Sequence, residues 1–135
     1  MNIKVKKLHK NAVMPFRAHS TDAGVDLVAV SVKLEGNKVI YETGLAFELP
    51  ENHFGFITNR SSIKDYDLII NAGVADTGFR GGIKVSFTRF GDKIYNVGDR
   101  VAQLVIVPCV LANFNEVYEL SESDRGTGGF GSTGK

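Results

Sequence analysis

Residues 83–88, with the sequence Ile-Lys-Val-Ser-Phe-Thr, alternate strictly between apolar and polar side chains. A second stretch, residues 44–49, has the same period of two, with Leu45, Phe47 and Leu49 as its apolar members. In an extended chain, alternate side chains lie on the same face, so each stretch has one face to bury. This pattern is typical of β-strands and predicts a sheet protein.

Turn residues divide the rest of the chain into short strands. A strand is expected within residues 1–10, and we expect strands of about 5 to 8 residues in general. A single short helix is predicted through residues 61–66, where serine can cap the first turn. The predicted class is all-β, a jelly roll or a related double sheet. The turn signals lie at residues 35–38, 50–52, 71–73, 91–92 and 96–99.

Composition limits the function classes. The 135 residues are 43% hydrophobic, enough for one compact domain, and no apolar run is long enough to span a membrane. The single cysteine, Cys109, excludes an internal disulfide and fits a cytoplasmic location. A net charge of +1 argues against a general nucleic-acid binder. We expect a β domain over residues 1–120, followed by a flexible, glycine-rich segment over residues 121–135.

The C-terminal segment carries chemistry that suits a nucleotide. Glycine-rich backbone can turn several N–H groups toward a phosphate, and Arg125 adds a charged fork. Phe130 offers a flat face for stacking on a base. Such a segment would close over a bound nucleotide as a lid. A disordered end without function is the alternative.

Polar residues inside the domain each have an ordinary and a functional interpretation. Arg60, with two serines after it, is either an anion site or a surface arginine beside capping serines. Asp76 is a carboxylate in a tight, glycine-rich β-arm that a ligand can approach closely, or a turn residue. Asp26, expected at a strand start, accepts from a magnesium-bound water or is a plain strand residue. Gln103, on a buried strand, needs hydrogen-bond partners, which the fold or a ligand can supply.

Covalent and metal-hydroxide chemistry are disfavoured. The three histidines, His9, His19 and His53, lack metal-ligand spacing, and no serine or cysteine stands in a recognisable nucleophile motif. Any metal would therefore be held by oxygen atoms.

Read in order, five segments of the chain resemble the five motifs of the trimeric dUTPase family. Residues 23–27 and 98–104 are similar to the family's Ala-Gly-Tyr-Asp-Leu and Gly-Asp-Arg-Ile-Ala-Gln-Leu. Residues 59–62 resemble Pro-Arg-Ser-Gly/Ser, and residues 125–134 resemble the glycine-rich last motif. The third motif, residues 73–81, departs most, because phenylalanine stands where the family has tyrosine.

The resemblance implies a homotrimer that cleaves dUTP to dUMP and pyrophosphate, with Mg²⁺ as cofactor and a jelly-roll-like fold. Each site would draw on three subunits, and Asp76 would activate the attacking water. Asp26 would act on the metal through water, with the substrate phosphates as direct ligands. The implied phosphate ligands are Arg60, Ser61, Ser62, Gln103, Arg125, Gly131, Ser132 and Thr133. The implied base and sugar contacts are Asn71, Gly73, Phe79, Lys84 and Phe130.

Two alternatives stay open. The Asp-Thr-Gly-Phe stretch at residues 76–79 also looks similar to the related dCTP deaminases, some of them bifunctional. Those enzymes carry a glutamate where this chain has Ser86, and they lack the glycine-rich lid. The other alternative is a catalytically idle nucleotide- or protein-binding module. The compact form resembles bacterial or phage members, and a phage origin would allow a regulatory protein partner.

Overall fold

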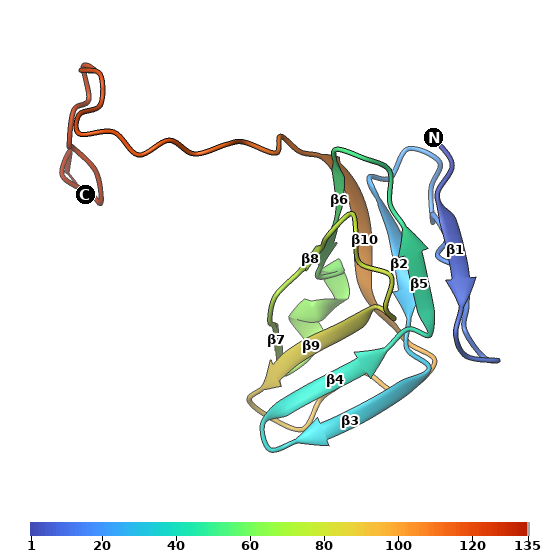
Figure 1. Cartoon of the computed structure of the whole chain (residues 1–135). Coiled ribbons are helices and arrows are strands. Elements are labelled where there is room, and N and C mark those ends of the chain that lie inside the picture. Colours follow the sequence, from blue (N-terminus) through green and yellow to red (C-terminus); the bar gives the residue numbers. More distant parts are fainter. Residues whose placement is uncertain (135) are drawn as a thin grey trace.

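A computed structural model describes residues 1–134 and is almost entirely β (Figure 1). All strand pairs are antiparallel. The strands are β1 (Lys4–Lys7), β2 (Gly24–Val28), β3 (Ser31–Glu35), β4 (Lys38–Glu42), β5 (Leu45–Glu48), β6 (His53–Thr58), β7 (Leu68–Ile70), β8 (Val74–Ala75), β9 (Lys84–Arg89) and β10 (Arg100–Pro108). One short 3-10 helix, η1, spans Ser61–Asp65.

The strands form two four-stranded sheets and one two-stranded sheet. The first sheet has the order β2-β10-β6-β8, the second has the order β3-β4-β9-β7, and β1 pairs with β5. Figure 1 shows the second sheet crossing below the first. The prediction of an all-β double sheet is confirmed.

Both large sheets contribute to one hydrophobic core. Leu27 and Val101 come from the first sheet, while Val39 and Phe87 come from the second, and all four are fully buried. The alternation over residues 83–88 is confirmed, because Ile83, Val85 and Phe87 are buried while Lys84 is exposed. In β5 the alternation is incomplete, because Ala46 is buried together with Leu45 and Phe47.

Some local expectations need correction. Asp26 lies in the middle of β2 rather than at its start. The strands range from two to nine residues. The helix forms where expected, but Arg60 is its N-cap residue and no side chain caps it. The Ser62 hydroxyl is instead engaged by two other side chains, which leaves it unavailable as a cap.

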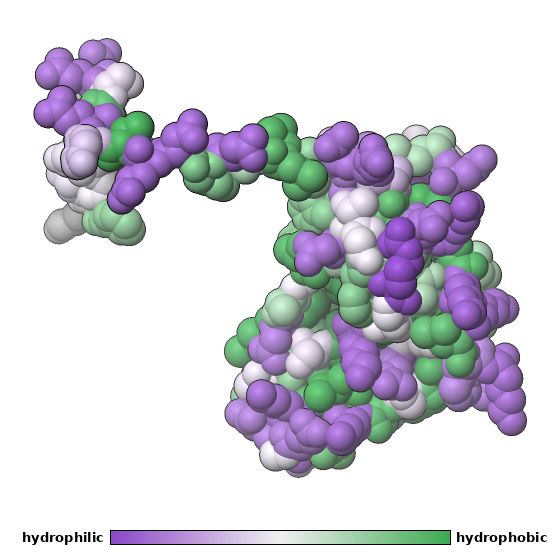
Figure 2. All heavy atoms as spheres, viewed as in Figure 1, coloured by the Kyte–Doolittle hydropathy of each residue, from purple (hydrophilic) through white to green (hydrophobic). Residues whose placement is uncertain are grey.

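The C-terminal segment leaves the body of the molecule. Strand β10 ends at Pro108, and residues 109–134 contain no strand and extend away from the sheets (Figure 1). The space-filling view shows apolar patches along this segment (Figure 2). Among residues 1–134, no helix is long and apolar enough to cross a membrane. The highly exposed apolar residues of the segment are Val110, Leu111, Phe114, Val117, Tyr118, Leu120 and Phe130.

Candidate active site

A carboxylate between two arginines lies on the first sheet. Asp26 Oδ1 accepts a hydrogen bond from Arg60 Nε at 3.0 Å, and Oδ2 accepts one from Arg100 Nη1 at 3.1 Å. The side chains of Asp26 and Arg60 are only 13% and 22% exposed, so water screens this pair weakly. One negative charge between two positive ones leaves a net positive charge, which suits an anionic ligand.

Two further polar side chains belong to this group. Arg60 Nη1 donates to Ser62 Oγ at 3.2 Å, and Gln103 Nε2 donates to the Asn59 carbonyl at 2.8 Å. Gly24 leaves room for Gln103, because a Cβ there would overlap the Gln103 Oε1 atom. Ser61 is exposed beside the group. We call Asp26, Arg60, Ser62, Arg100 and Gln103 the arginine cluster.

One member of the arginine cluster, Arg100, and two of its neighbours, Tyr95 and Asn59, were given no role by the sequence. Arg100 lies in the motif at residues 98–104, but its ion pair with Asp26 could not be predicted, because it depends on β2 and β10 being neighbours. Tyr95, between β9 and β10, has its hydroxyl 2.9 Å from Ser62 Oγ, and no sequence pattern signals that contact. Asn59 Oδ1 is buried and finds no hydrogen-bond partner within residues 1–134. A buried acceptor of this kind needs a partner from water, a ligand or another chain.

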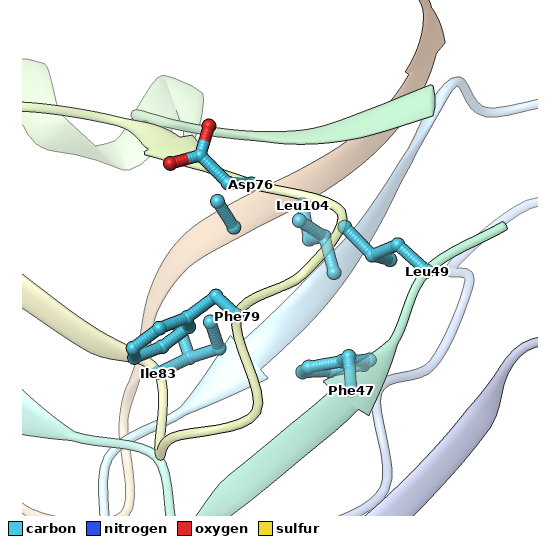
Figure 3. A pocket seen from close by; sticks show the side chains of 7 residues that line it. Phe47, Leu49, Asp76, Phe79, Ile83 and Leu104 are labelled. Atoms are coloured by element: carbon cyan, nitrogen blue, oxygen red, sulfur yellow. The ribbon is translucent and has the colours of Figure 1, made fainter. Parts of the chain in front are cut away.

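Asp76 follows strand β8, on the same sheet, at the edge of an apolar pocket. Figure 3 shows its carboxylate pointing away from the side chains of Phe79, Ile83 and Leu104. A wider, open hollow of about 410 Å³ has Asp76, Phe79 and Lys84 among its lining residues. Phe79 is 49% exposed and its ring lies beside Ile83 (Figure 3). A flat apolar ligand could rest on this surface with its polar end at Asp76.

The β-arm before Asp76 is tightly held. The Gly73 carbonyl accepts a hydrogen bond from the Ile57 amide at 2.6 Å, and a Cβ on Gly73 would overlap the Ile57 carbonyl. Asn71 Nδ2 donates to Ser86 Oγ at 3.3 Å, and Asn71 Oδ1 accepts from Thr88 Oγ1 at 3.0 Å. The backbone of the arm is therefore fixed, and only glycine fits at position 73.

The predicted lid residues form a third, separate group. Arg125 Nε donates to the Gly128 carbonyl at 2.7 Å, so the segment folds on itself in turns. Gly131 and Phe130 adopt positive φ angles of 83° and 52°. Phe130 is fully exposed, and Ser132 and Thr133 are exposed beside it. Within one chain, this C-terminal segment extends away from the sheets that carry the arginine cluster and Asp76 (Figure 1).

The residues fit magnesium only in a limited way. Residues 1–134 contain no group of three His, Cys, Asp or Glu side chains that could hold a metal. Asp26 is the one carboxylate of the arginine cluster, and each of its oxygens keeps a lone pair after accepting from an arginine. This donor set suits a contact through a metal-bound water, with the direct ligands coming from elsewhere.

Burial sets the protonation of the tyrosines behind the arginine cluster. Desolvation raises the pKa of Tyr41 to about 12, and it also raises the pKa of Tyr95, although the Ser62 hydrogen bond and Arg60 act in the opposite direction. Both hydroxyls therefore keep their protons throughout the physiological range.

The fold and these groups define a class of protein: an antiparallel β protein suited to a ligand with a flat apolar part and an anionic part, as in a nucleotide. The dUTPase family model matches residues 10–134. The chain belongs to the dUTPase family, as the resemblance of its motifs predicted.

Curated relatives match over the whole chain. One is the deoxyuridine 5'-triphosphate nucleotidohydrolase of Clostridium tetani, 42% identical, with 98% of this chain and 97% of the relative covered. Another, with the same name, is from Gloeothece citriformis, at 41% identity over 99% of this chain and 97% of the relative.

Solved structures of phage proteins share the fold. The dUTPase of Staphylococcus bacteriophage 80alpha with dUPNHPP has a TM-score of 0.87 and 32% identity, and the match covers 99% of both chains. A mutant dUTPase from phage phi11 of S. aureus, described with a structural Mg(II) ion, has a TM-score of 0.77 and 29% identity. That match covers 88% of this chain and 98% of the phi11 chain.

Proposed function

We propose that this chain is a magnesium-dependent dUTP diphosphatase that acts as a cytoplasmic homotrimer. The observation that carries the proposal is one sheet with two kinds of site: an exposed carboxylate, Asp76, beside an apolar hollow, and an arginine cluster suited to phosphate. The names of the whole-length relatives support dUTP as the substrate. The reaction would limit uracil in DNA and supply dUMP for dTMP synthesis.

The nucleoside end would lie against the β-arm. Phe79 would pack on the deoxyribose and exclude a 2′-hydroxyl by overlap, a task that needs the ring and not the hydroxyl that the family's tyrosine carries. Backbone groups near Gly73 and Lys84, with Asn71 behind them, would read the uracil edge. The hydrogen bond from Ile57 to Gly73 supports this role, because a rigid backbone presents its groups in one arrangement.

The phosphate end would lie on the arginine cluster. Arg60 offers a planar charged fork, while Ser61, Ser62 and Gln103 add polar groups beside it. Arg125, Gly131, Ser132 and Thr133 would close over the last phosphate, with Phe130 stacked on the base. The exposure of Phe130 and the glycine-rich turns around it support a segment that orders on binding.

Asp76 would activate the attacking water. The carboxylate accepts a proton as the water oxygen bonds to the α-phosphorus. The bond between the α-phosphorus and the oxygen that bridges to the β-phosphorus then breaks, and pyrophosphate leaves with that oxygen. The products are dUMP and pyrophosphate. The exposed, outward direction of Asp76 supports contact with solvent (Figure 3).

Magnesium on the phosphates would lower the cost of charge that builds up during the reaction. Asp26 would accept a hydrogen bond from a water on that ion, while Arg60 and Arg100 hold the Asp26 carboxylate in place. Removal of the metal with EDTA should abolish turnover, and added Mg²⁺ should restore it.

A trimer would bring the three groups of residues together. In the single chain the glycine-rich segment extends away from both sheets (Figure 1), so a complete site would draw on other copies of the chain. The segment's apolar side chains support this, since Phe114 is 93% exposed and Val110 is 91% exposed in the single chain. Apolar surface of that extent is typical of an interface. An active monomer found by size-exclusion chromatography with light scattering would contradict the trimer.

The deaminase alternative lacks its acid–base group. A cytosine deaminase of this fold needs a glutamate where this chain has Ser86, and the Ser86 hydroxyl accepts a hydrogen bond from Asn71. An idle binding module remains the other alternative. The deciding experiment assays pyrophosphate release from dUTP beside ammonia release from dCTP. Pyrophosphate alone supports the proposal, ammonia supports the deaminase, and neither product supports the binding module.

A further inference from the structure

Tyr95 connects the buried core to the arginine cluster. It is only 2% exposed, and its ring stacks on Tyr66 with 4.0 Å between ring centroids. The rings of Tyr41 and Phe87 pack near it, at 6.3 Å and 6.2 Å between centroids. The Tyr41 hydroxyl also donates to the Tyr95 carbonyl at 2.8 Å. Ring and backbone are therefore both held, so the hydroxyl of Tyr95 has one position.

The Tyr95 hydroxyl contacts Ser62 Oγ, which already accepts a hydrogen bond from another side chain. Ser62 Oγ lies 2.9 Å from the Tyr95 hydroxyl and accepts from Arg60 Nη1 at 3.2 Å. A serine hydroxyl has two lone pairs and one hydrogen. If Tyr95 donates, both lone pairs are filled and the Ser62 hydrogen is left for another acceptor. If Ser62 donates to Tyr95, its hydrogen is used within the protein.

We propose that Tyr95 is a positioning residue for the phosphate chain: it donates to Ser62 Oγ, so that Ser62 directs its own hydrogen to a phosphate oxygen beside Arg60. This inference rests on the proposed function, which assigns Ser62 and Arg60 to the phosphates. The geometry supports it, because the buried and stacked ring holds the Tyr95 hydroxyl 2.9 Å from Ser62 Oγ. Ser62 and Asp26 accept from different nitrogens of Arg60, Nη1 and Nε respectively, and together they hold its guanidinium.

The test is Tyr95→Phe, which keeps the ring and removes only the hydroxyl. Tyr66→Phe is the matched control, because its ring lies in the same stack and its hydroxyl makes no hydrogen bond within residues 1–134. Affinity is measured for dUpNHpp, which carries the phosphate chain, and for deoxyuridine, which carries none. We expect Tyr95→Phe to weaken dUpNHpp binding about 3- to 10-fold, the size of one lost hydrogen bond, and to leave deoxyuridine binding unchanged. Tyr66→Phe should change neither.

A double-mutant cycle with Ser62→Ala identifies the route. If Tyr95 acts through Ser62, Tyr95→Phe should cause no further loss of dUpNHpp affinity in the Ser62→Ala background. Additive losses, or equal losses for deoxyuridine and dUpNHpp, would overturn the inference. Melting temperatures check the folding of each variant. Should Tyr95→Phe melt below the assay temperature, Ser62→Ala alone must still show the selective loss.

The outcomes separate this inference from the proposed function. A wild-type protein that releases pyrophosphate from dUTP, together with a Tyr95→Phe variant that binds dUpNHpp normally, overturns only the role of Tyr95. A wild-type protein without pyrophosphate release overturns the proposed function, and the role of Tyr95 with it.

Discussion

The substitution Gly24→Ala should weaken phosphate binding without unfolding the protein. A Cβ at position 24 would overlap Gln103 Oε1 and lie 3.0 Å from its Cδ atom. These atoms form the end of a flexible side chain, so Gln103 can turn away while the backbone stays in place. In turning, the amide leaves the Asn59 carbonyl, to which it donates at 2.8 Å.

Two opposing terms set the stability of this variant. Loss of the hydrogen bond costs about 0.5 to 1.5 kcal/mol. Replacing glycine by alanine inside a strand recovers about 0.5 to 1 kcal/mol, because the unfolded chain has less freedom. We therefore expect the free energy of unfolding to change by less than about 1 kcal/mol. Under the proposed function binding loses more, since Gln103 would no longer contact the phosphates, and dUpNHpp affinity should fall about 5- to 10-fold.

The assay compares dUpNHpp with deoxyuridine by calorimetry, and urea denaturation measures stability. Gln103→Ala is the matched background, because it removes the overlapping amide and leaves Gly24 only a 3.2 Å approach to the Cβ of residue 103. In that background Gly24→Ala should cause little further loss of affinity. A full second loss, or an equal loss of deoxyuridine affinity, would refute the idea that Gly24 acts by making room for Gln103.

Four further outcomes test the site and the fold. Asp76→Asn should keep dUpNHpp affinity and lower turnover about 10²- to 10⁴-fold, as measured by pyrophosphate release; normal turnover would mean that another group activates the water. Truncation before Arg125 should leave a folded trimer with little turnover, checked by light scattering and the same assay. Asp26→Asn should lower the free energy of unfolding by about 2 kcal/mol, a value between those typical of exposed and of buried ion pairs. Glu35→Gln is the control, because it removes an exposed ion pair and should change the free energy of unfolding little. Because burial raises the pKa of Tyr41 from 10.0 to about 12, the folded state keeps a proton that the unfolded chain releases. Stability should thus fall across that pH range by roughly 1.4 kcal/mol per unit, and Tyr41→Phe should flatten the slope in urea denaturation.

The sequence by itself determined the fold class and the family. The period of two in residues 83–88 predicts a strand with one buried face, and the structure buries Ile83, Val85 and Phe87. Such patterns are readable because side-chain alternation is a local property of the extended backbone. The five motifs were likewise found in the sequence alone, and the family that they indicated is confirmed by the family model, which matches residues 10–134.

The contacts of the site residues depended on tertiary structure. Asp26 and Arg100 are 74 positions apart, and they pair only because β2 and β10 are neighbours in the first sheet. A serine was expected to cap the short helix, yet no side chain caps it, and the Ser62 hydroxyl contacts Tyr95, which lies in the connection between β9 and β10. Strand order and long-range side-chain contacts arise from the packing of the whole core. No single segment of the sequence contains the information that specifies them.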